Sequence, residues 1–202
     1  MKIIKDVDPI YDTEKYDVIL VGTSISGSMA SGLQGKIARK YPYVDKENDL
    51  QPYRDNRRLG TRLTLKKEGN PIISLCYISK FNMNNRETVL YDSLENCLAT
   101  ANAEFKGKKV LTTIMGSTKV DGNGDREKCL KIIEENTKDL DIDVYDYEQI
   151  SAFDERQKIC GEIYKYNREN NIKLNKKDLL ELRIKKFKEH FVNTITYNAS
   201  FY

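Results

Sequence analysis

A short apolar stretch runs directly into a loop of glycine and hydroxyl residues and then into a helical pattern, over residues 17–42 (DVILVGTSISGSMASGLQGKIARKYP). The first amides of a helix have no partner inside the helix and lie at the positive end of its dipole, so such a corner can bind an anion. Glycine lets the main chain approach a ligand closely. Because the loop fits neither GxxxxGK[ST] nor GxGxxG, it predicts a phosphate or nucleotide site of neither class. The alternative is a glycine-rich turn that serves packing alone.

Length and composition limit what can surround this corner. The 202 residues suffice for one domain with a real core and an appendage. The formal net charge of +3 is too small to indicate a nucleic acid partner. The basic excess lies in residues 150–202, where 11 Lys and Arg stand against 7 Asp and Glu. A single histidine, His190, excludes catalysis by a histidine pair.

The four cysteines form no CxxC pair, and most lie in apolar periodic segments. We interpret them as buried thiols of a reducing compartment. The sequence has no apolar run long enough to span a bilayer and begins with polar, charged residues. It therefore predicts a cytoplasmic protein without a membrane association, and it gives no sign of a metal site or a cofactor.

Strand and helix patterns alternate along the first three quarters of the chain. Strands are expected at residues 16–21, 62–65, 71–78, 109–114 and 142–147, and helices at 27–40, 89–105 and 125–137. This alternation predicts an α/β fold whose largely parallel sheet is covered on both faces and binds ligands at the carboxyl ends of its strands.

Two further segments carry expectations of their own. Residues 43–60 are polar and are expected to form an irregular flap, where Arg54, Arg57 and Arg58 face either a phosphate or, in the favoured alternative, solvent. From residue 151 the pattern is a helix, a break at Asn170-Asn171, and a second helix at about residues 175–193. We therefore divide the chain into a domain of residues 1–149 and a basic helical extension of residues 150–202, which docks on the sheet domain or on a protein partner.

A second loop, residues 114–125 (IMGSTKVDGNGD), repeats the chemistry of the first, because it also follows a strand and opens a helix. Two such corners on one sheet predict a ligand with two ends, such as a diphosphate that satisfies the free amides of both. Asp6 precedes the first corner, and its carboxylate could accept a hydrogen bond from the amino group of a base. The alternative is an ordinary surface acid.

In their order and spacing these motifs resemble the macro domain, the ADP-ribose-binding fold. IKDV is similar to the family's IxGDI start, whose aspartate reads adenine, which assigns that role to Asp6. The first loop resembles the ADP-ribose 1″-phosphate phosphatase branch, with its GS-x-x-x-G at Gly27, Ser28 and Gly32 and a Tyr-Pro after the helix. The second loop stands where the family binds the distal ribose and phosphate. A compact domain with this first loop is also familiar from viral, including phage, sequences.

The resemblance covers about residues 3–147 and implies a three-layer α/β/α mixed sheet with a C-terminal helical appendage. The ligand-binding residues that it implies are Asp6, Gly22, Thr23, Ser24, Gly27, Ser28, Gly32, Gly116, Ser117, Thr118 and Gly122.

The implied chemistry depends on the branch. The phosphatase branch has a histidine where Val21 stands and an asparagine where Ser24 stands, and this chain has neither. The macro-type terminal ADP-ribose glycohydrolases have a lysine and an aspartate, which correspond to Lys80 and Asp121 as catalytic residues. There an amine with a lowered pKa attacks the anomeric carbon while a carboxylate handles the proton. Asp125 competes for the carboxylate role.

Three functions remain open. The first is hydrolysis of a substituent at the terminal ribose, as an ADP-ribose 1″-phosphate phosphatase or an ADP-ribosyl hydrolase. The second is a non-catalytic module that sequesters ADP-ribose or a related nucleotide. The third is an interaction protein that acts through its basic tail.

Overall fold

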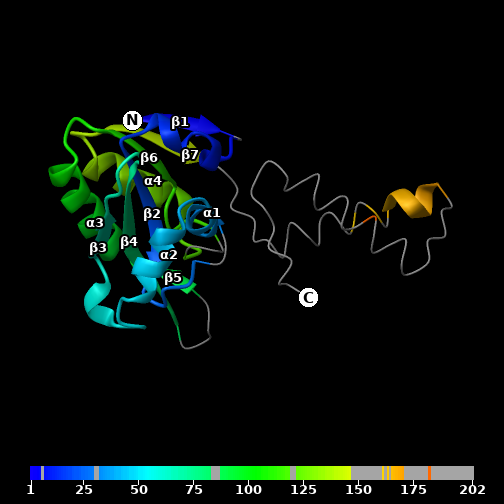
Figure 1. The fold of residues 1–202 in the computed structure, drawn as a ribbon, viewed down its shortest axis with the longest axis horizontal. Coiled ribbons are helices and arrows are strands. Elements are labelled where there is room, and N and C mark those ends of the chain that lie inside the picture. The colour runs from blue at the N-terminus through cyan, green and yellow to red at the C-terminus, as the bar shows by residue number, and fades with distance from the viewer. Residues whose placement is uncertain are drawn as a thin grey trace. The chain divides into compact units, whose positions relative to one another are not determined.

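The computed structural model describes residues 1–5, 7–29, 32–82, 87–118 and 122–146, and beyond these residues 161, 163, 165–170 and 182. The chain divides into two units, Met1–Gln149 and Ile150–Tyr202, and each is described by itself (Figure 1). In the second unit residues 165–169 are helical. The helix expected at residues 175–193 lies outside the described residues, apart from Leu182. Within the described ranges, no helix has the length and apolar character needed to cross a membrane.

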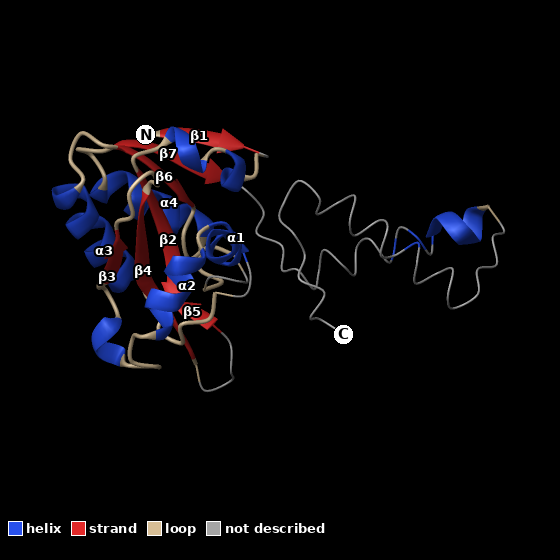
Figure 2. Ribbon diagram, in the orientation of Figure 1, coloured by secondary structure: helices blue, strands red, loops and turns tan. Residues whose placement is uncertain are grey.

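The first unit is built on one mixed sheet (Figure 2). The strand order is β1-β7-β6-β2-β4-β3, and β5 also pairs with β4. The first five strands in this order run parallel to one another, whereas β3 and β5 run antiparallel to β4. The strands are β1 (Lys2–Lys5), β2 (Val18–Ser24), β3 (Arg62–Leu65), β4 (Ile72–Phe81), β5 (Glu87–Val89), β6 (Lys109–Thr113) and β7 (Asp141–Asp146).

Helices cover both faces of this sheet, so the predicted three-layer α/β/α class is confirmed. One apolar cluster joins the sheet to α1 and α2, and the other joins it to α3 and α4. The helices are α1 (Gly32–Lys40), α2 (Pro42–Asp49), α3 (Tyr91–Glu104) and α4 (Arg126–Asn136), with short 3-10 turns η1 (Pro9–Tyr11), η2 (Thr13–Lys15) and η3 (Asn56–Arg58).

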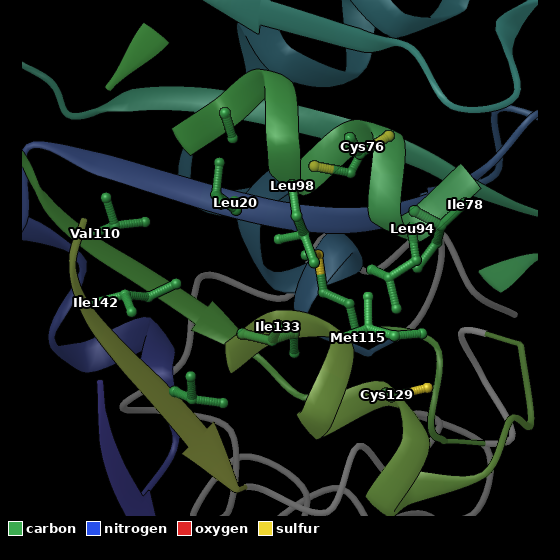
Figure 3. Packing of buried hydrophobic residues seen from close by; sticks show 14 of the residues in the cluster. Leu20, Cys76, Ile78, Leu94, Leu98, Val110, Met115, Cys129, Ile133 and Ile142 are labelled. Atoms are coloured by element: carbon green, nitrogen blue, oxygen red, sulfur yellow. The ribbon is translucent and has the colours of Figure 1, made fainter. Parts of the chain in front are cut away.

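Strand β2 lies inside the sheet, and all seven of its residues are buried. Its side chains alternate between the two cores, so Leu20 faces α3 and α4 while Val21 faces α1 and α2. In Figure 3, Leu94 and Leu98 lie over the same sheet face as Leu20. A strand buried on both faces carries a continuous apolar run, which is what the sequence shows there. Cys76, Cys97 and Cys129 are buried and form no disulfide among the described residues, and Cys160 lies outside them.

Several predicted boundaries need correction. The helix expected at residues 27–40 begins only at Gly32, because Gly27 has a φ of +73°, a left-handed value at the residue where the helix was expected to start. The helix expected at residues 89–105 begins at Tyr91, since Val89 ends β5. The short strands β1 and β5 were not predicted.

The expectation of an irregular flap at residues 43–60 is wrong for residues 43–49 and holds for residues 50–60, which form turns and η3. Residues 43–49 belong to α2, which begins at Pro42 and buries Val44 and Asn48, four residues apart. Arg58 neither faces solvent nor is free for a phosphate, because it is buried and donates to the carbonyl groups of Ile25 and Pro52. Helix α2 was missed because its sequence is mostly polar and its stability comes from tertiary contacts.

A chain of hydroxyl and carboxylate groups ties the segment before β2 to β7. The Tyr145 hydroxyl donates to Asp12 and the Tyr16 hydroxyl to Asp143, both at 2.7 Å, and the two phenol oxygens are 3.0 Å apart. Burial raises the pKa of Tyr145 to about 12, so its hydroxyl stays a donor. The hydrogen bond from Lys15 lowers the pKa of Asp12 most, and the hydrogen bond from Tyr145 lowers it further.

We expect Tyr145→Phe to lower the free energy of unfolding by about 1–2 kcal/mol at pH 7, because it removes a partly buried hydrogen bond to a carboxylate. The folded-state pKa of Asp12 lies below its unfolded value. Its contribution is therefore complete above about pH 4 and is lost as the pH falls through the folded-state pKa. Urea unfolding should show a difference from the native chain that shrinks at pH 3. Tyr11→Phe, at an exposed tyrosine, is the control and should cost little at either pH. A difference that does not change with pH would contradict this account.

Candidate functional site

The carboxyl ends of five parallel strands lie along one edge of the sheet. Strands β2 and β6 are neighbours, so the first loop (residues 25–31) and the second loop (residues 114–125) start side by side. Strand β4, on the other side of β2, carries Lys80 as its last residue but one. At the far side, β1 ends at Lys5, directly before Asp6. The topology thus gathers both loops and Lys80 at one edge.

Two of the predicted site residues cannot be placed further. Asp6 and Asp121 lie outside the described residues, and their roles as adenine reader and catalytic carboxylate stay predictions.

Gly22, Thr23 and Ser24 belong to β2 rather than to the first loop, because the strand runs three residues beyond its predicted end. A Cβ at Gly22 would lie 2.9 Å from Ile78 Cδ1 and 3.2 Å from Met115 Cβ, so glycine here serves packing between β4 and the second loop. The Thr23 hydroxyl is buried and has no hydrogen-bond partner among the described residues.

The first loop begins with a tight turn that folds over the end of β4. Ile25 N donates to Ser79 O at 3.1 Å, and Gly27 N donates to Ser24 O at 3.0 Å. The Ser24 hydroxyl accepts a hydrogen bond from Ser26 N, so its side chain is used within the turn. Beyond the turn Ser28 is exposed, and Gly32 opens α1. The turn therefore presents its next residues at the edge of the sheet.

The second loop is an arch closed by its own main chain. Gly124 N donates to Gly116 O and Asn123 N to Thr118 O, both at 2.7 Å. The Ser117 hydroxyl donates to Ile114 O, so it too is used within the loop. The arch fits around one side chain, since a Cβ at Gly116 or at Gly124 would lie 2.5 Å from a methyl group of Val89. Glycine is therefore required by close packing as well as by φ, which is +83° at Gly116.

The first amides of α4, the helix that follows this arch, were expected to be free for a ligand, but they are partly used. Asp125 caps α4, since its carboxylate accepts from Lys128 N at 2.7 Å. An ionised carboxylate at this position disfavours a second anion. The second loop can thus contribute its own amides to a ligand, but the N-terminus of α4 is occupied. Asp125 also has a capping role that the sequence analysis did not assign.

Strand β5 connects the strand that carries Lys80 with the second loop. Thr88 pairs with Lys80, and Val89 N donates to the oxygen of Gly122, the residue after Asp121. Strand β4, which carries Lys80, and the second loop are therefore both hydrogen-bonded to β5. Lys80 itself is half-buried. The β-branched pair Thr88-Val89 was the available signal for β5, but three residues are too few for a period-two pattern.

The phosphatase residues are absent from the structure as well as from the sequence. The Val21 side chain is buried in the core under α1 and α2. No group at that position can transfer a proton at the site edge.

Comparison with solved structures identifies this architecture. A protein of unknown function from Bacteroides thetaiotaomicron has a TM-score of 0.57 at 16% identity and covers 72% of this chain and 98% of its own. The macrodomain of Thermus aquaticus DarG has a TM-score of 0.53 at 13% identity, and the match covers 73% of this chain and 97% of that protein. Thermosipho africanus DarTG in complex with ADP-ribose has a TM-score of 0.54 at 12% identity, and the match covers 72% of this chain and 41% of that protein. No family model matches the sequence, and neither does any curated protein.

The first unit therefore has the macro domain fold, which confirms the resemblance that the motifs suggested. At these levels of identity the likeness concerns the fold. The closer resemblance to the phosphatase branch stays a prediction.

We expect Gly116→Ala to destabilise the fold by more than Gly69→Ala, its matched control. Both glycines have positive φ, +83° and +73°, so both variants carry the backbone cost of about 1 kcal/mol. Only at Gly116 does the new methyl group meet Val89, because nothing lies within 4 Å of a Cβ at Gly69.

Urea unfolding of both variants measures the difference. Adding Val89→Ala to Gly116→Ala makes room for the new methyl group and should recover part of the loss, so the double-mutant cycle should show coupling. Equal losses in the two alanine variants, or no coupling to Val89, would contradict the close packing of the arch.

Proposed function

We propose that the first unit binds ADP-ribose or a derivative of it across the carboxyl ends of β1, β7, β6, β2 and β4. The observation that carries the proposal is the side-by-side start of two glycine loops at the ends of neighbouring parallel strands. Ligands of open α/β sheets bind at this end of the strands. The Thermosipho africanus DarTG structure, which has the same fold, holds ADP-ribose.

The order of the strands supports an extended ligand with two different ends. Four strand spacings of about 4.8 Å separate β1 from β4, so the edge measures about 19 Å. That length suits a base and a sugar joined by a diphosphate better than one phosphate group. In this orientation the adenine lies near Asp6, the diphosphate between the loops, and the terminal ribose on the β4 side with Lys80.

Within this proposal, hydrolysis at the terminal ribose is assigned to Lys80. Its amine would form a bond to C1″ while the bond from C1″ to the substituent breaks, and a carboxylic acid of the second loop would protonate the leaving oxygen. Water would then displace the lysine. An ADP-ribosyl hydrolase is favoured over a phosphatase, since Val21 is buried in the core and has no proton to transfer.

The second candidate is a binding module that does not turn its ligand over. It is favoured by the same residues, because Val21 stands in place of the histidine and Ser24 in place of the asparagine of the phosphatase branch. The two candidates share a ligand and differ in the fate of its terminal ribose.

Calorimetric titration should show that ADP-ribose binds and that AMP, which lacks the distal phosphate and the terminal ribose, binds more weakly. Absence of heat with millimolar ADP-ribose would end the proposal.

For catalysis, we expect release of ADP-ribose from an ADP-ribosylated carboxylate to fall by several orders of magnitude, up to about 10⁶-fold, in Lys80→Ala, since the variant removes the nucleophile. Lys108→Ala is the matched control, because Lys108 is exposed and precedes β6 at the opposite edge of the sheet. Phosphate release from ADP-ribose 1″-phosphate is measured alongside. If the native chain consumes neither substrate yet binds ADP-ribose, the binding module is correct.

A further inference from the structure

Three buried polar side chains lie behind the first loop, and the sequence analysis considered only Arg58 among them, as a residue that faces a phosphate or solvent. Asn48 of α2, Arg58 of η3 and Tyr77 of β4 are 1%, 7% and 2% exposed. We call them the loop clamp. The Arg58 guanidinium lies 3.9 Å from the centre of the Tyr77 ring and donates to Ile25 O. The clamp thus reaches the main chain of the first loop from the core side.

The clamp fixes which way the Asn48 amide faces. Its Oδ1 accepts from the Tyr77 hydroxyl at 2.9 Å and from Arg58 Nη2 at 3.3 Å. Burial raises the pKa of Tyr77 despite the opposing effect of Arg58, so the phenol remains protonated and remains a donor. With two donors facing Oδ1, the Nδ2 group points the other way, where it donates to Gly27 O at 2.7 Å.

A held carbonyl determines where the next amide points. The peptide group is planar, and in its trans form the C=O of one residue and the N–H of the next point in opposite directions. Because Gly27 O faces Asn48 in the core, Ser28 N–H faces away from the core. Ser28 is exposed, and among the described residues its amide has no hydrogen-bond partner. Gly27 reaches this orientation at φ +73°, which favours glycine.

We propose that Asn48 is a positioning residue that sets the orientation of the Gly27–Ser28 peptide, so that the Ser28 amide donates to the distal phosphate of the ligand. This inference rests on the proposed function and names the donor within it. The first loop lies between β6 and β4, so its amide serves the half of the ligand nearer Lys80. Asn48 touches no ligand and acts only through the loop.

Asn48→Asp tests the proposal with almost no change of shape. The aspartate keeps an oxygen for Tyr77 and Arg58 but replaces the donor toward Gly27 O by an acceptor, which disfavours the present peptide orientation. We expect the affinity for ADP-ribose to fall about tenfold or more, and the affinity for AMP to change by less than about threefold. A merely structural role for Asn48 would lower both affinities together.

Asn136→Asp is the matched control. Its Nδ2 also donates to a main-chain carbonyl, that of Ile132 at 2.9 Å, but it lies at the end of α4. It should leave both affinities unchanged. Native affinity for ADP-ribose in Asn48→Asp, or an equal loss for ADP-ribose and AMP, overturns the proposal.

A measurement without ligand separates this inference from the proposed function. In the free protein, the Ser28 amide resonance should move in Asn48→Asp and stay in place in Asn136→Asp. If the native chain binds no ADP-ribose, the proposed function fails, and this resonance still shows whether Asn48 orients the peptide. An unmoved Ser28 resonance in Asn48→Asp overturns the inference.

Discussion

The pairing of β2 with β6 on one side and with β4 on the other is the constraint on which the rest of the first unit depends. Every residue of β2 is buried, so the strand contributes to both apolar cores at once. Removing this apolar surface from water favours the fold, and the parallel pairing determines where the strand ends lie. The same interaction that stabilises the domain therefore places the first loop, the second loop and Lys80 at one edge.

Close packing around three apolar side chains explains why glycine recurs at this edge. Gly22 leaves room for Ile78 and Met115, and the arch of the second loop surrounds Val89. Val89 belongs to β5, which also pairs with the strand that carries Lys80. The glycines thus have packing roles that do not require a ligand. The amides that they leave at the surface are the feature that connects packing to the proposed ligand binding.

The sequence predicted the parts of the fold that have a local signal. Strand β3 was predicted at its observed residues, and α4 fills the predicted helix between its cap residues Asp125 and Thr137. The three-layer class followed from the alternation of strands and helices. Short or polar elements were missed, since β1 and β5 have four and three residues and α2 buries only Val44 and Asn48.

The two loops of the candidate site could be predicted from the sequence, but the loop clamp that holds the first loop could not. Glycine and hydroxyl residues after a strand mark the first and second loops directly. Nothing in the sequence marks Asn48, and the arginine cluster marks Arg58 only for a phosphate or for solvent. Both residues belong to a polar segment and acquire their partners only when that segment folds onto β4 and the first loop. Tyr77 looked like an ordinary strand residue. Long-range hydrogen bonds of this kind have no sequence period from which they could be predicted.

A crystal structure of the chain with ADP-ribose tests the central claim most directly. The account predicts that the ligand lies along the carboxyl ends of the parallel strands. Its distal phosphate oxygens should be within hydrogen-bond distance of Ser28 N, and C1″ of its terminal ribose should be beside Lys80. A ligand bound at the amino ends of the strands, or one whose diphosphate contacts neither loop, would contradict the account.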